Sequence, residues 1–215
     1  MKTCLYLGTD PKHFAEKQPY CRIIHTPLIR IEPRPVTDSE LQQAYVKWPH
    51  YTHLIVTSKQ SGRVLFDHLG ALQIGELDKT WIAVGQITAQ HLVERGVKVA
   101  HVATPETQEG VIALLETLDL QHSTLFCPKS SLSRPLLESF LKSKAIAYQA
   151  SVLYDTHFVK PVFEPNWEHI DEIVFTSPST VSAFIQIFGE IPADKVCTPI
   201  GPITAQALRE KITRY

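Results

Sequence analysis

The sequence predicts an α/β protein with two similar parallel-sheet domains, one of them inserted into the other. Short apolar runs alternate with stretches of helical period along most of the chain, a pattern typical of parallel sheets with helices on both faces. A block of sequence also occurs twice, which indicates duplication of a domain-sized unit. Two such domains would offer a ligand site between them.

The repeated block joins one apolar strand to a second strand that ends in a glycine turn. The first copy consists of His53–Ser58 and Trp81–Leu92, and the second of Glu172–Ser177 and Cys197–Leu208. Both copies have Thr-Ser after the first strand and Gly-x-Ile-Thr-Ala-Gln-x-Leu after the second. Their nearly equal spacing favours two domains in a chain of 215 residues.

The expected strands are short runs rich in aliphatic and β-branched residues. In chain order they are Thr3–Leu7, Arg22–Thr26, His53–Thr57, Trp81–Val84, Val97–Val102, Thr124–Cys127, Ala145–Leu153, Glu172–Thr176 and Val196–Ile200. The segments between them have a helical period of apolar residues. These expected helices are Lys12–Lys17, Ser39–Lys47, Lys59–Leu69, Ile87–Arg95, Glu109–Leu118, Arg134–Lys142, Pro178–Phe188 and Ile203–Lys211. Ser58 and Ser177 suit helix N-caps, and Pro178 suits the first helical position.

Two proline-rich stretches, Pro27–Pro35 and Phe158–Pro165, interrupt this alternation. Proline lacks a ladder donor and biases the preceding residue toward extended geometry, so both stretches are interpreted as linkers. The resulting division is domain 1 at 1–30 plus 165–215, domain 2 at 37–157, and linkers at 27–36 and 157–165. The chain then crosses between the domains twice, which restricts twisting and permits hinge bending.

The overall composition excludes several classes of function. The formal net charge of −1 gives no basic footprint for nucleic acid, and no apolar run reaches the roughly 18 residues of a membrane span. The N-terminal apolar run is too short for a signal peptide, so we expect a cytoplasmic protein. The four cysteines include no Cys-x-x-Cys pair and are expected to be reduced and mostly buried. A metal site is not expected, although His50 and His53 have a spacing that puts two residues on one face of a helix.

Ligands of open parallel sheets bind beyond the carboxyl ends of the strands, and both copies of the repeat place polar residues there. These residues are Ser58, Lys59, Gly85 and Thr88 in the first copy and Ser177, Gly201 and Thr204 in the second. Helix N-termini carry unpaired N–H groups and partial positive charge. Four of them facing one cleft suit a ligand with several carboxylates or phosphates. Purely structural capping is the alternative, since each motif alone is a common device.

Two further features stand at predicted strand ends. The loop Cys127–Arg134 carries Lys129 and Arg134, which can receive an anion, but it lacks the Gly-x-x-x-x-Gly-Lys frame of a nucleotide-binding loop. An ordinary solvated loop is the alternative. Tyr154 ends a strand at the start of the second linker. Either its ring packs on the connector, or its hydroxyl points into the interdomain cleft as a donor.

Taken in order, these motifs resemble the uroporphyrinogen-III synthase family over nearly the whole chain. The segments that carry the resemblance are Pro27–Pro33, Ile55–Ser58, Val84–Ala89, Pro105–Gly110, Val152–Thr156, Phe175–Ser179 and Ile200–Ala205. The resemblance implies two flavodoxin-like domains joined by a two-stranded linker. It also implies a lyase of porphyrin and haem biosynthesis that needs no cofactor. Its substrate would be hydroxymethylbilane, a linear tetrapyrrole, which is cyclised to uroporphyrinogen III with loss of water and inversion of the terminal ring.

The resemblance also implies roles for the residues singled out above. Tyr154 would assist departure of the substrate hydroxyl as the catalytic residue. The substrate carboxylates would be held by Ser58, Lys59, Gly85, Thr88, Lys129, Arg134, Ser177, Ser179, Gly201 and Thr204. The enzyme would be a monomer that takes its substrate by hand-over from the upstream hydroxymethylbilane synthase. The alternative function is a non-catalytic two-lobed binder of a small polyanion.

The chain departs from the family pattern at three places. Asp10 precedes Pro11 where relatives often have arginine, and Lys59 follows the first Thr-Ser where many relatives have proline and then a basic residue. The second copy of the repeat is followed only by the last residues up to Tyr215, whereas the first copy continues through Gly96–Leu118. Domain 1 is therefore expected to lack an edge strand and a covering helix, which exposes an edge.

Overall fold

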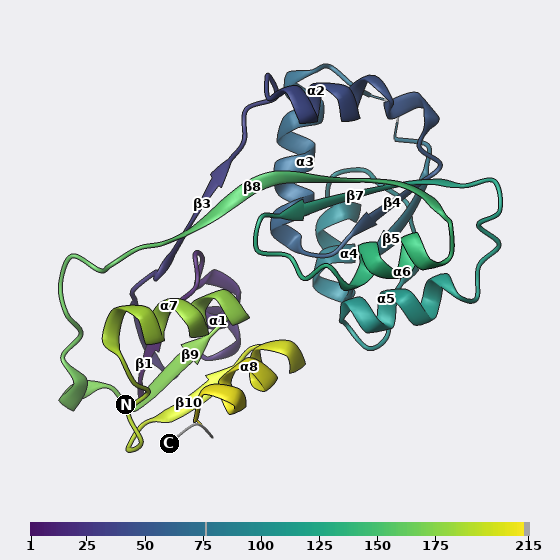
Figure 1. The fold of residues 1–215 in the computed structure, drawn as a ribbon. Helices are drawn as coiled ribbons and strands as arrows, with labels where there is room; N and C mark the ends of the chain where they lie inside the picture. The colour runs from purple at the N-terminus through teal and green to yellow at the C-terminus, as the bar shows by residue number, and fades with distance from the viewer. Residues whose placement is uncertain (76, 213–215) are drawn as a thin grey trace. The chain divides into compact units, whose positions relative to one another are not determined.

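A computed structural model describes residues 1–75 and 77–212 of the chain. The chain forms two compact units (Figure 1). Unit 1 consists of Met1–Ile31 and Thr156–Tyr215, and unit 2 consists of Glu32–Asp155. The sequence of unit 2 thus interrupts that of unit 1, and each unit is built around its own sheet.

Unit 1 contains a four-stranded parallel sheet in the order β10-β9-β1-β2. Its strands are β1 (Thr3–Tyr6), β2 (Arg22–His25), β9 (Glu172–Phe175) and β10 (Val196–Pro199). Its helices are α1 (Lys12–Lys17), α7 (Pro178–Phe188) and α8 (Pro202–Ile212), with a short 3-10 helix η2 (Trp167–His169). Within the described residues, β10 is the last strand of the chain and forms one edge of this sheet.

The unit 1 sheet is buried on both faces because its central strands are apolar at consecutive positions. On one face, Leu5 and Ile173 pack with Phe184 of α7. On the other face, Tyr6 packs with Phe14 of α1. Continuous apolar strands are typical of parallel sheets covered on both sides, which is the reason for the run pattern seen in the sequence.

Unit 2 contains a six-stranded sheet in the order β3-β8-β7-β4-β5-β6. Its strands are β3 (Ile29–Pro33), β4 (His53–Val56), β5 (Thr80–Ala83), β6 (Val99–Val102), β7 (Thr124–Ser130) and β8 (Ala147–Phe158). The start of β3 and the end of β8 extend into unit 1. Its helices are α2 (Ser39–Val46), α3 (Lys59–Ala71), α4 (Gln86–Val93), α5 (Gln108–Leu115) and α6 (Leu136–Ser143), with a 3-10 helix η1 (Trp48–His50). The pairs β8–β7, β7–β4, β4–β5 and β5–β6 are all parallel.

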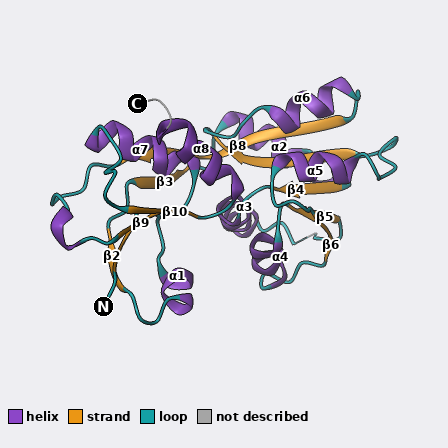
Figure 2. Cartoon of the chain, turned by 90° about the horizontal axis from the view of Figure 1, so that it is seen from below, coloured by secondary structure: helices purple, strands orange, loops and turns teal. Residues whose placement is uncertain are grey.

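The two faces of the unit 2 sheet are covered by different helices (Figure 2). On one face, Ile55 packs with Val111 of α5 and Leu141 of α6. On the opposite face lie α3 and α4. Phe126 belongs to an aromatic cluster on this opposite face, because Leu125 and Cys127 on either side of it pack toward α5 and α6. In that cluster the ring centroids of Trp48 and Phe126 are 6.1 Å apart with the planes nearly perpendicular. Large aromatic rings bury much area for little lost side-chain freedom, so this cluster anchors η1 to the sheet.

The edge strand β3 pairs with β8 in antiparallel fashion. The N–H of Arg34 donates to the carbonyl of Leu153 at 2.8 Å, and the N–H of Val159 donates to the carbonyl of Leu28 at 2.9 Å. Residue numbers rise along one strand as they fall along the other, which defines the direction. The first proline-rich stretch is therefore extended, as its prolines predict, and it is also hydrogen-bonded to a second strand.

The predicted parallel α/β architecture is confirmed, and every predicted strand and helix is present. The prediction of a loop over Cys127–Arg134 is wrong at its start, because β7 continues through Ser130 in register with β8. Helix α6 begins at Leu136 and not at Arg134. The reason is Pro135, since a residue that precedes proline is disfavoured in the helical region.

Candidate functional site

The parallel strands of each unit bring their carboxyl ends to one edge of the sheet. In unit 2 this edge carries Ser58 after β4, Gly85 after β5 and Lys129 near the end of β7. Tyr154 lies on β8 in register with Ser130, the last residue of β7. It therefore stands at the same edge although its own strand continues. The structure thus gathers predicted site residues from four strands of unit 2.

Tyr154 and Ser58 are in contact at this edge. Oη of Tyr154 lies 3.4 Å from Oγ of Ser58. Ser58 is the N-cap of α3, where its Oγ accepts the N–H of Ser61 at 3.0 Å and lies 2.8 Å from Oγ of Ser61. Tyr154 is only 5% exposed, so packing fixes its ring. The resulting row of three hydroxyls ends at the positive end of the α3 dipole.

Gly85 is the N-cap of α4, and a carboxylate of the chain itself lies beside it. The N–H of Gln86 donates to Oε1 of Glu106 at 2.9 Å. Gly85 has extended backbone with φ −177°, which any residue adopts, so its conformation does not require glycine. A Cβ at this position would instead collide with the carboxyl group of Glu106. Glycine leaves room here for the close approach of an anion, and Glu106 supplies that anion.

Glu106 is a site residue that the sequence reasoning missed. Its position depends on Gly110 of α5, because a Cβ at Gly110 would run into the carbonyl of Pro105. The turn before α5 therefore folds closely onto that helix, and Thr107 caps it by accepting the N–H of Gly110 at 3.1 Å. The segment Pro105–Gly110 was one of the motifs noted in the sequence. Nothing in the sequence connects it with Gly85.

Lys59 and the two repeated threonines differ in exposure. Lys59 occupies the first position of α3 and is exposed. Thr88 in the first turn of α4 is 5% exposed, and Thr204 in the first turn of α8 is 3% exposed. The two threonines occupy the same position in the repeat, and both are buried. Both side chains are shielded from solvent, whereas solvent still reaches Lys59.

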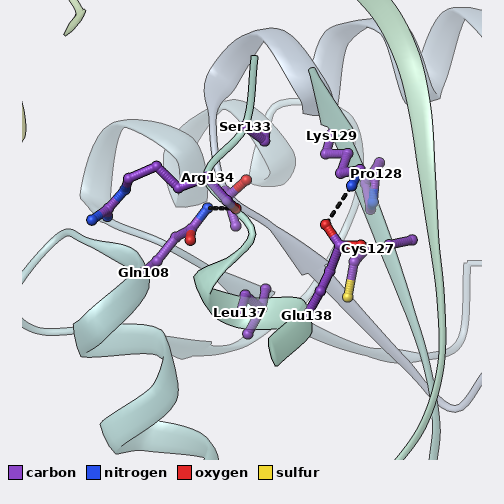
Figure 3. A pocket seen from close by; sticks show the side chains of 10 residues that line it. Gln108, Cys127, Pro128, Lys129, Ser133, Arg134, Leu137 and Glu138 are labelled. Carbon is purple, nitrogen blue, oxygen red and sulfur yellow. Dashed lines mark hydrogen bonds and ion pairs between the residues drawn. The ribbon is translucent and has the colours of Figure 1, made fainter. Parts of the chain in front are cut away.

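Both cations predicted in the segment from β7 to α6 are paired with glutamates, and Figure 3 shows the pair made by Lys129. The ammonium of Lys129 pairs with Glu138 of α6. Arg134 donates from Nη1 and Nη2 to the two carboxylate oxygens of Glu109, at 2.6 and 3.0 Å. These hydrogen bonds from Arg134 lower the pKa of Glu109 to about 2. The guanidinium is directed away from the Lys129–Glu138 pair. The sequence predicted the two cations but not their partners.

Unit 1 has a comparable edge at the ends of β1, β9 and β10. Ser177 is the N-cap of α7, and its Oγ accepts the N–H of Thr180 at 3.3 Å. Oγ1 of Thr180 accepts the N–H of Ser177 at 3.1 Å, which completes a capping box. Ser179 adds a third hydroxyl, with its Oγ 2.8 Å from that of Ser177. The cap predicted from the sequence is confirmed, and it is made of neutral hydroxyls.

Gly201 and Gly85 hold equivalent places in the repeat but are glycine for different reasons. Gly201 has φ +83°, in the left-handed region that favours glycine. Apart from the two adjoining residues, no described residue has an atom within 4 Å of the place where its Cβ would stand. At Gly85 the backbone is ordinary and the neighbouring space is filled by Glu106. Gly201 therefore allows a left-handed backbone conformation, whereas Gly85 leaves space for the carboxylate of Glu106.

Asp10, the acidic departure from the family pattern, hydrogen-bonds within its own loop. Its Oδ1 accepts the N–H of Lys12 at 2.9 Å, at the start of α1. Its carbonyl accepts the hydroxyl of Tyr6 at 2.8 Å. His25 fastens the same loop, with Nε2 lying 2.8 Å from the carbonyl of Gly8. The loop after β1 is thus held by its own hydrogen bonds.

Three broad features complete the description. Within residues 1–75 and 77–212, no group of three or more His, Cys, Asp or Glu side chains has the arrangement of a metal site. In the same ranges, no helix is long and apolar enough to cross a membrane. Cys4, Cys21, Cys127 and Cys197 are free thiols.

Comparisons with known proteins point to one family. The family model described as uroporphyrinogen-III synthase HemD matches residues 18–214. A mutant uroporphyrinogen III synthase from Thermus thermophilus has a similar fold, with a TM-score of 0.69 and 18% identity over 98% of this chain and 89% of that one. The synthetase from Helicobacter pylori gives a TM-score of 0.63 and 18% identity over 98% and 89%. A comparison with curated proteins finds no match. Because the family model covers most of the sequence, the chain belongs to the uroporphyrinogen-III synthase family.

Proposed function

We propose that the chain catalyses the reaction for which its family is named. Hydroxymethylbilane is cyclised to uroporphyrinogen III, with loss of water and inversion of the terminal ring. The observation that carries this function is the family match over residues 18–214. The chain is accordingly a lyase of haem biosynthesis. A non-catalytic binder of a polyanion is not favoured, because it would leave that match without an explanation.

The reaction requires control of geometry more than strong acid or base chemistry. Loss of the substrate hydroxyl gives an electrophilic carbon, and the far ring attacks it through a substituted position to form a spiro intermediate. Without control, the open chain closes to the type I isomer. The enzyme must therefore hold a flexible polyanion with its ends close together, which contributes through positioning. It must also stabilise the departing oxygen.

Tyr154 is the group that we assign to the departing hydroxyl. Its phenol donates a hydrogen bond to that oxygen, and Oη then accepts one from Ser58, whose Oγ lies 3.4 Å away. Oγ of Ser58 in turn accepts from the N–H of Ser61 in the first turn of α3. Negative charge that develops on the phenol oxygen is thereby shared with a second hydroxyl and a helix N-terminus. The contact between Tyr154 and Ser58 supports this assignment.

The substrate carboxylates are assigned to the strand-end positions of both units. In unit 1 we assign them to the starts of α7 and α8, at Ser177, Ser179, Gly201 and Thr204. In unit 2 we assign them to Ser58, Lys59, Gly85, Thr88, Lys129 and Arg134. The close approach of Glu106 to Gly85 supports the view that a carboxylate fits the start of α4. A substrate carboxylate at that place would have to displace Glu106.

The proposal extends to the relationship between the two units, which we take to be copies of one flavodoxin-like domain. Unit 1 has the strand order β2-β1-β9-β10, and unit 2 has β8-β7-β4-β5-β6 when β3 is left out. The repeat equates β4 with β9 and β5 with β10. The orders then coincide if β7 corresponds to β1 and β8 to β2. This is the flavodoxin order 2-1-3-4-5, with the strands of unit 2 in permuted sequence.

The proposal also includes the setting in which the enzyme acts. We assign it to the cytoplasm, because its four cysteines are free thiols, as is usual in a reducing compartment. We expect it to act as a monomer and to receive hydroxymethylbilane by hand-over from the upstream synthase. Size-exclusion chromatography with light scattering, alone and with that synthase, measures both points.

The test of function is a coupled assay. Hydroxymethylbilane is generated by its upstream synthase, the chain is added, and the products are oxidised and separated as type I and type III isomers. The expected result is a shift from type I to type III product. Product that stays type I in the presence of folded protein would overturn the proposal.

A further inference from the structure

Besides the N–H that it donates to Ser58, Ser61 in the first turn of α3 has a buried hydroxyl. The residue is only 1% exposed. Its Oγ lies 2.8 Å from Oγ of Ser58, which is the single hydrogen-bond partner of this hydroxyl among the described residues. A serine hydroxyl has one proton to donate, and buried polar groups are normally paired. The hydroxyl proton of Ser61 is therefore donated to Ser58.

This donation sets the direction of the other protons in the row of hydroxyls. Oγ of Ser58 has two lone pairs, and the N–H and O–H of Ser61 occupy both of them. The proton of Ser58 is then left for Oη of Tyr154, which lies 3.4 Å away. Because Oη accepts this hydrogen bond, the phenol proton of Tyr154 points away from the row.

The opposite order of hydrogen bonds would use the phenol proton inside the protein. In that order Tyr154 donates to Ser58, and Ser58 donates to Ser61. The hydroxyl proton of Ser61 is then buried without an acceptor among the described residues. A buried donor without an acceptor retains the full cost of its desolvation, so the order that begins at Ser61 is favoured.

The corresponding cap of unit 1 directs its proton differently. Thr180 stands three residues after the cap residue Ser177, as Ser61 does after Ser58. Oγ1 of Thr180 donates to the carbonyl of Ser177 at 2.7 Å and accepts the N–H of Thr176 at 3.1 Å. The proton of Thr180 is thus bound to the backbone, whereas that of Ser61 begins a row of side chains that ends at a tyrosine.

A change of register in β8 accompanies the contact between Tyr154 and Ser58. Lys129 of β7 is opposite Val152, but the next residue, Ser130, is opposite Tyr154. β8 thus contains one additional residue at this point. Such irregularities redirect a side chain and are frequent beside active sites, which favours a functional reason for the position of Tyr154.

We infer that Ser61 is a positioning residue for the reaction, an inference that rests on the proposed function. Its hydroxyl orders the protons of Ser58 and Tyr154 so that the phenol proton faces the departing hydroxyl of the substrate. Because its side chain is buried, Ser61 acts through these two residues and not on the substrate. Removal of its hydroxyl opens a lone pair of Ser58 to the phenol proton, so Tyr154 donates inward in part of the molecules.

The experiment measures initial rates of type III formation with freshly prepared hydroxymethylbilane at varied concentrations. Ser61→Ala is expected to lower kcat about threefold to tenfold and to leave KM unchanged, because the interaction acts only in the transition state. In the Tyr154→Phe background, Ser61→Ala should cause no further fall in kcat. Ser61→Cys keeps a weak donor, so its kcat should lie below that of wild type and above that of Ser61→Ala. This variant keeps the inference testable if alanine prevents folding.

Ser151→Ala is the matched control, because it removes another buried serine hydroxyl of unit 2. Ser151 on β8 is fully buried, and its Oγ accepts from Nε2 of Gln149 at 3.2 Å, outside the row. Its kcat should stay at the wild-type value.

Three outcomes would overturn the inference. They are an unchanged kcat in folded Ser61→Ala or Ser61→Cys, an equal fall in Ser151→Ala, and a further fall when Ser61→Ala is added to Tyr154→Phe. Wild-type protein that yields only the type I isomer contradicts the proposed function. Wild-type protein that yields type III, with an unchanged kcat in Ser61→Ala, contradicts this inference alone.

Discussion

Unit 1 and unit 2 share a repeat, but different side chains occupy the positions that follow its strands. In unit 2, Glu106, Glu109 and Glu138 each occupy a helix N-terminus or pair with a cation. In unit 1, the hydroxyl of Ser177 caps a helix, and apart from the two adjoining residues no described residue lies close to the missing Cβ of Gly201. Unit 2 therefore carries charges balanced from within the chain, whereas the turns after β9 and β10 of unit 1 are neutral. A repeat predicts where a site lies, but it does not predict what fills it.

The largest expected effect tests whether unit 2 alone carries the reacting group. Tyr154→Phe removes the donor to the departing hydroxyl, so type III formation should fall about tenfold or more, roughly 1.4 kcal/mol of barrier. The measurement is the initial rate in the coupled assay. Tyr148→Phe is the control, because Tyr148 lies on the same strand in register with Leu125, toward its other end. An unchanged rate in Tyr154→Phe would return that residue to a packing role.

The next effect separates the two glycines of the repeat. Gly85→Ala should cost about 1–2 kcal/mol of unfolding free energy, because Glu106 must leave its charge-assisted hydrogen bond with Gln86. Gly201→Ala should cost about 1 kcal/mol, because its φ of +83° strains any residue with a Cβ. The measurement is denaturant unfolding of each variant.

A double mutant distinguishes the two causes. Once Glu106→Ala has removed the carboxylate, Gly85→Ala should cost little more. The same Glu106→Ala background should leave the cost of Gly201→Ala unchanged, since the two sites share no partner. Additive costs for Gly85→Ala and Glu106→Ala would contradict the assignment of Gly85 to a carboxylate.

A smaller effect is expected at the repeated threonines, one in each unit. Thr88→Ala and Thr204→Ala should each slow type III formation less than about threefold, near 0.6 kcal/mol. The reason is that both side chains are buried and that many contacts share the binding of a polyanion. Each rate is compared with the thermal midpoint of the same variant. Complete loss of activity from either change in a folded protein would contradict shared binding.

The pH dependence of stability also differs between the two units. Near neutral pH its expected effect is the smallest of those predicted here. In unit 2, burial lowers the pKa of His68 and His91, and the nearby Arg95 adds to the shift at His91. The unfolded chain then binds more protons than the folded one, so stability falls as pH drops below about 6.5. In unit 1, burial raises the pKa of Glu172 but hydrogen bonds led by Thr198 outweigh it, so the pKa is lowered. Stability from Glu172 is lost only below about pH 4.5.

Amide hydrogen exchange at pH 7.5 and 5.5 measures this difference. Protection of β4 and β5 in unit 2 should decrease more than protection of β1 and β9 in unit 1. His91→Gln keeps a polar side chain without a titrating proton, so it should reduce the pH dependence of unit 2. A larger decrease in protection in unit 1 than in unit 2 between these two pH values would contradict the assignment of this pH dependence to His68 and His91.

The secondary structure could be predicted from the sequence because its signals are local. Apolar runs mark the buried strands, and the cap at Ser177 is encoded within four residues. The partners of the site residues could not be predicted in this way. Gln86 meets Glu106 across 20 positions and Arg134 meets Glu109 across 25. Such pairs depend on which loops the fold brings together.

For the candidate site, too, the sequence predicted the local features but not the contacts between residues that are distant in sequence. Ser58 was found as a cap, but its contact with Tyr154 spans 96 positions and arises only through the sheet order. The extension of β7 through Ser130 was missed because the apolar run that marks this strand ends at Cys127. In the fold, Pro128 lies on a strand paired with β8.

The interruption of unit 1 by unit 2 has a consequence for the order of folding. β1 pairs with β9, where Cys4 and Glu172 are partners 168 positions apart, and closing so long a loop is entropically costly. During synthesis, all of unit 2 emerges before β9 does. Once folded, unit 2 holds its two ends side by side through the β3–β8 pairing and the Arg34–Asp155 ion pair at 2.9 Å. Unit 2 then acts as an internal template for the assembly of unit 1, so substitutions in its core should also reduce the yield of folded unit 1.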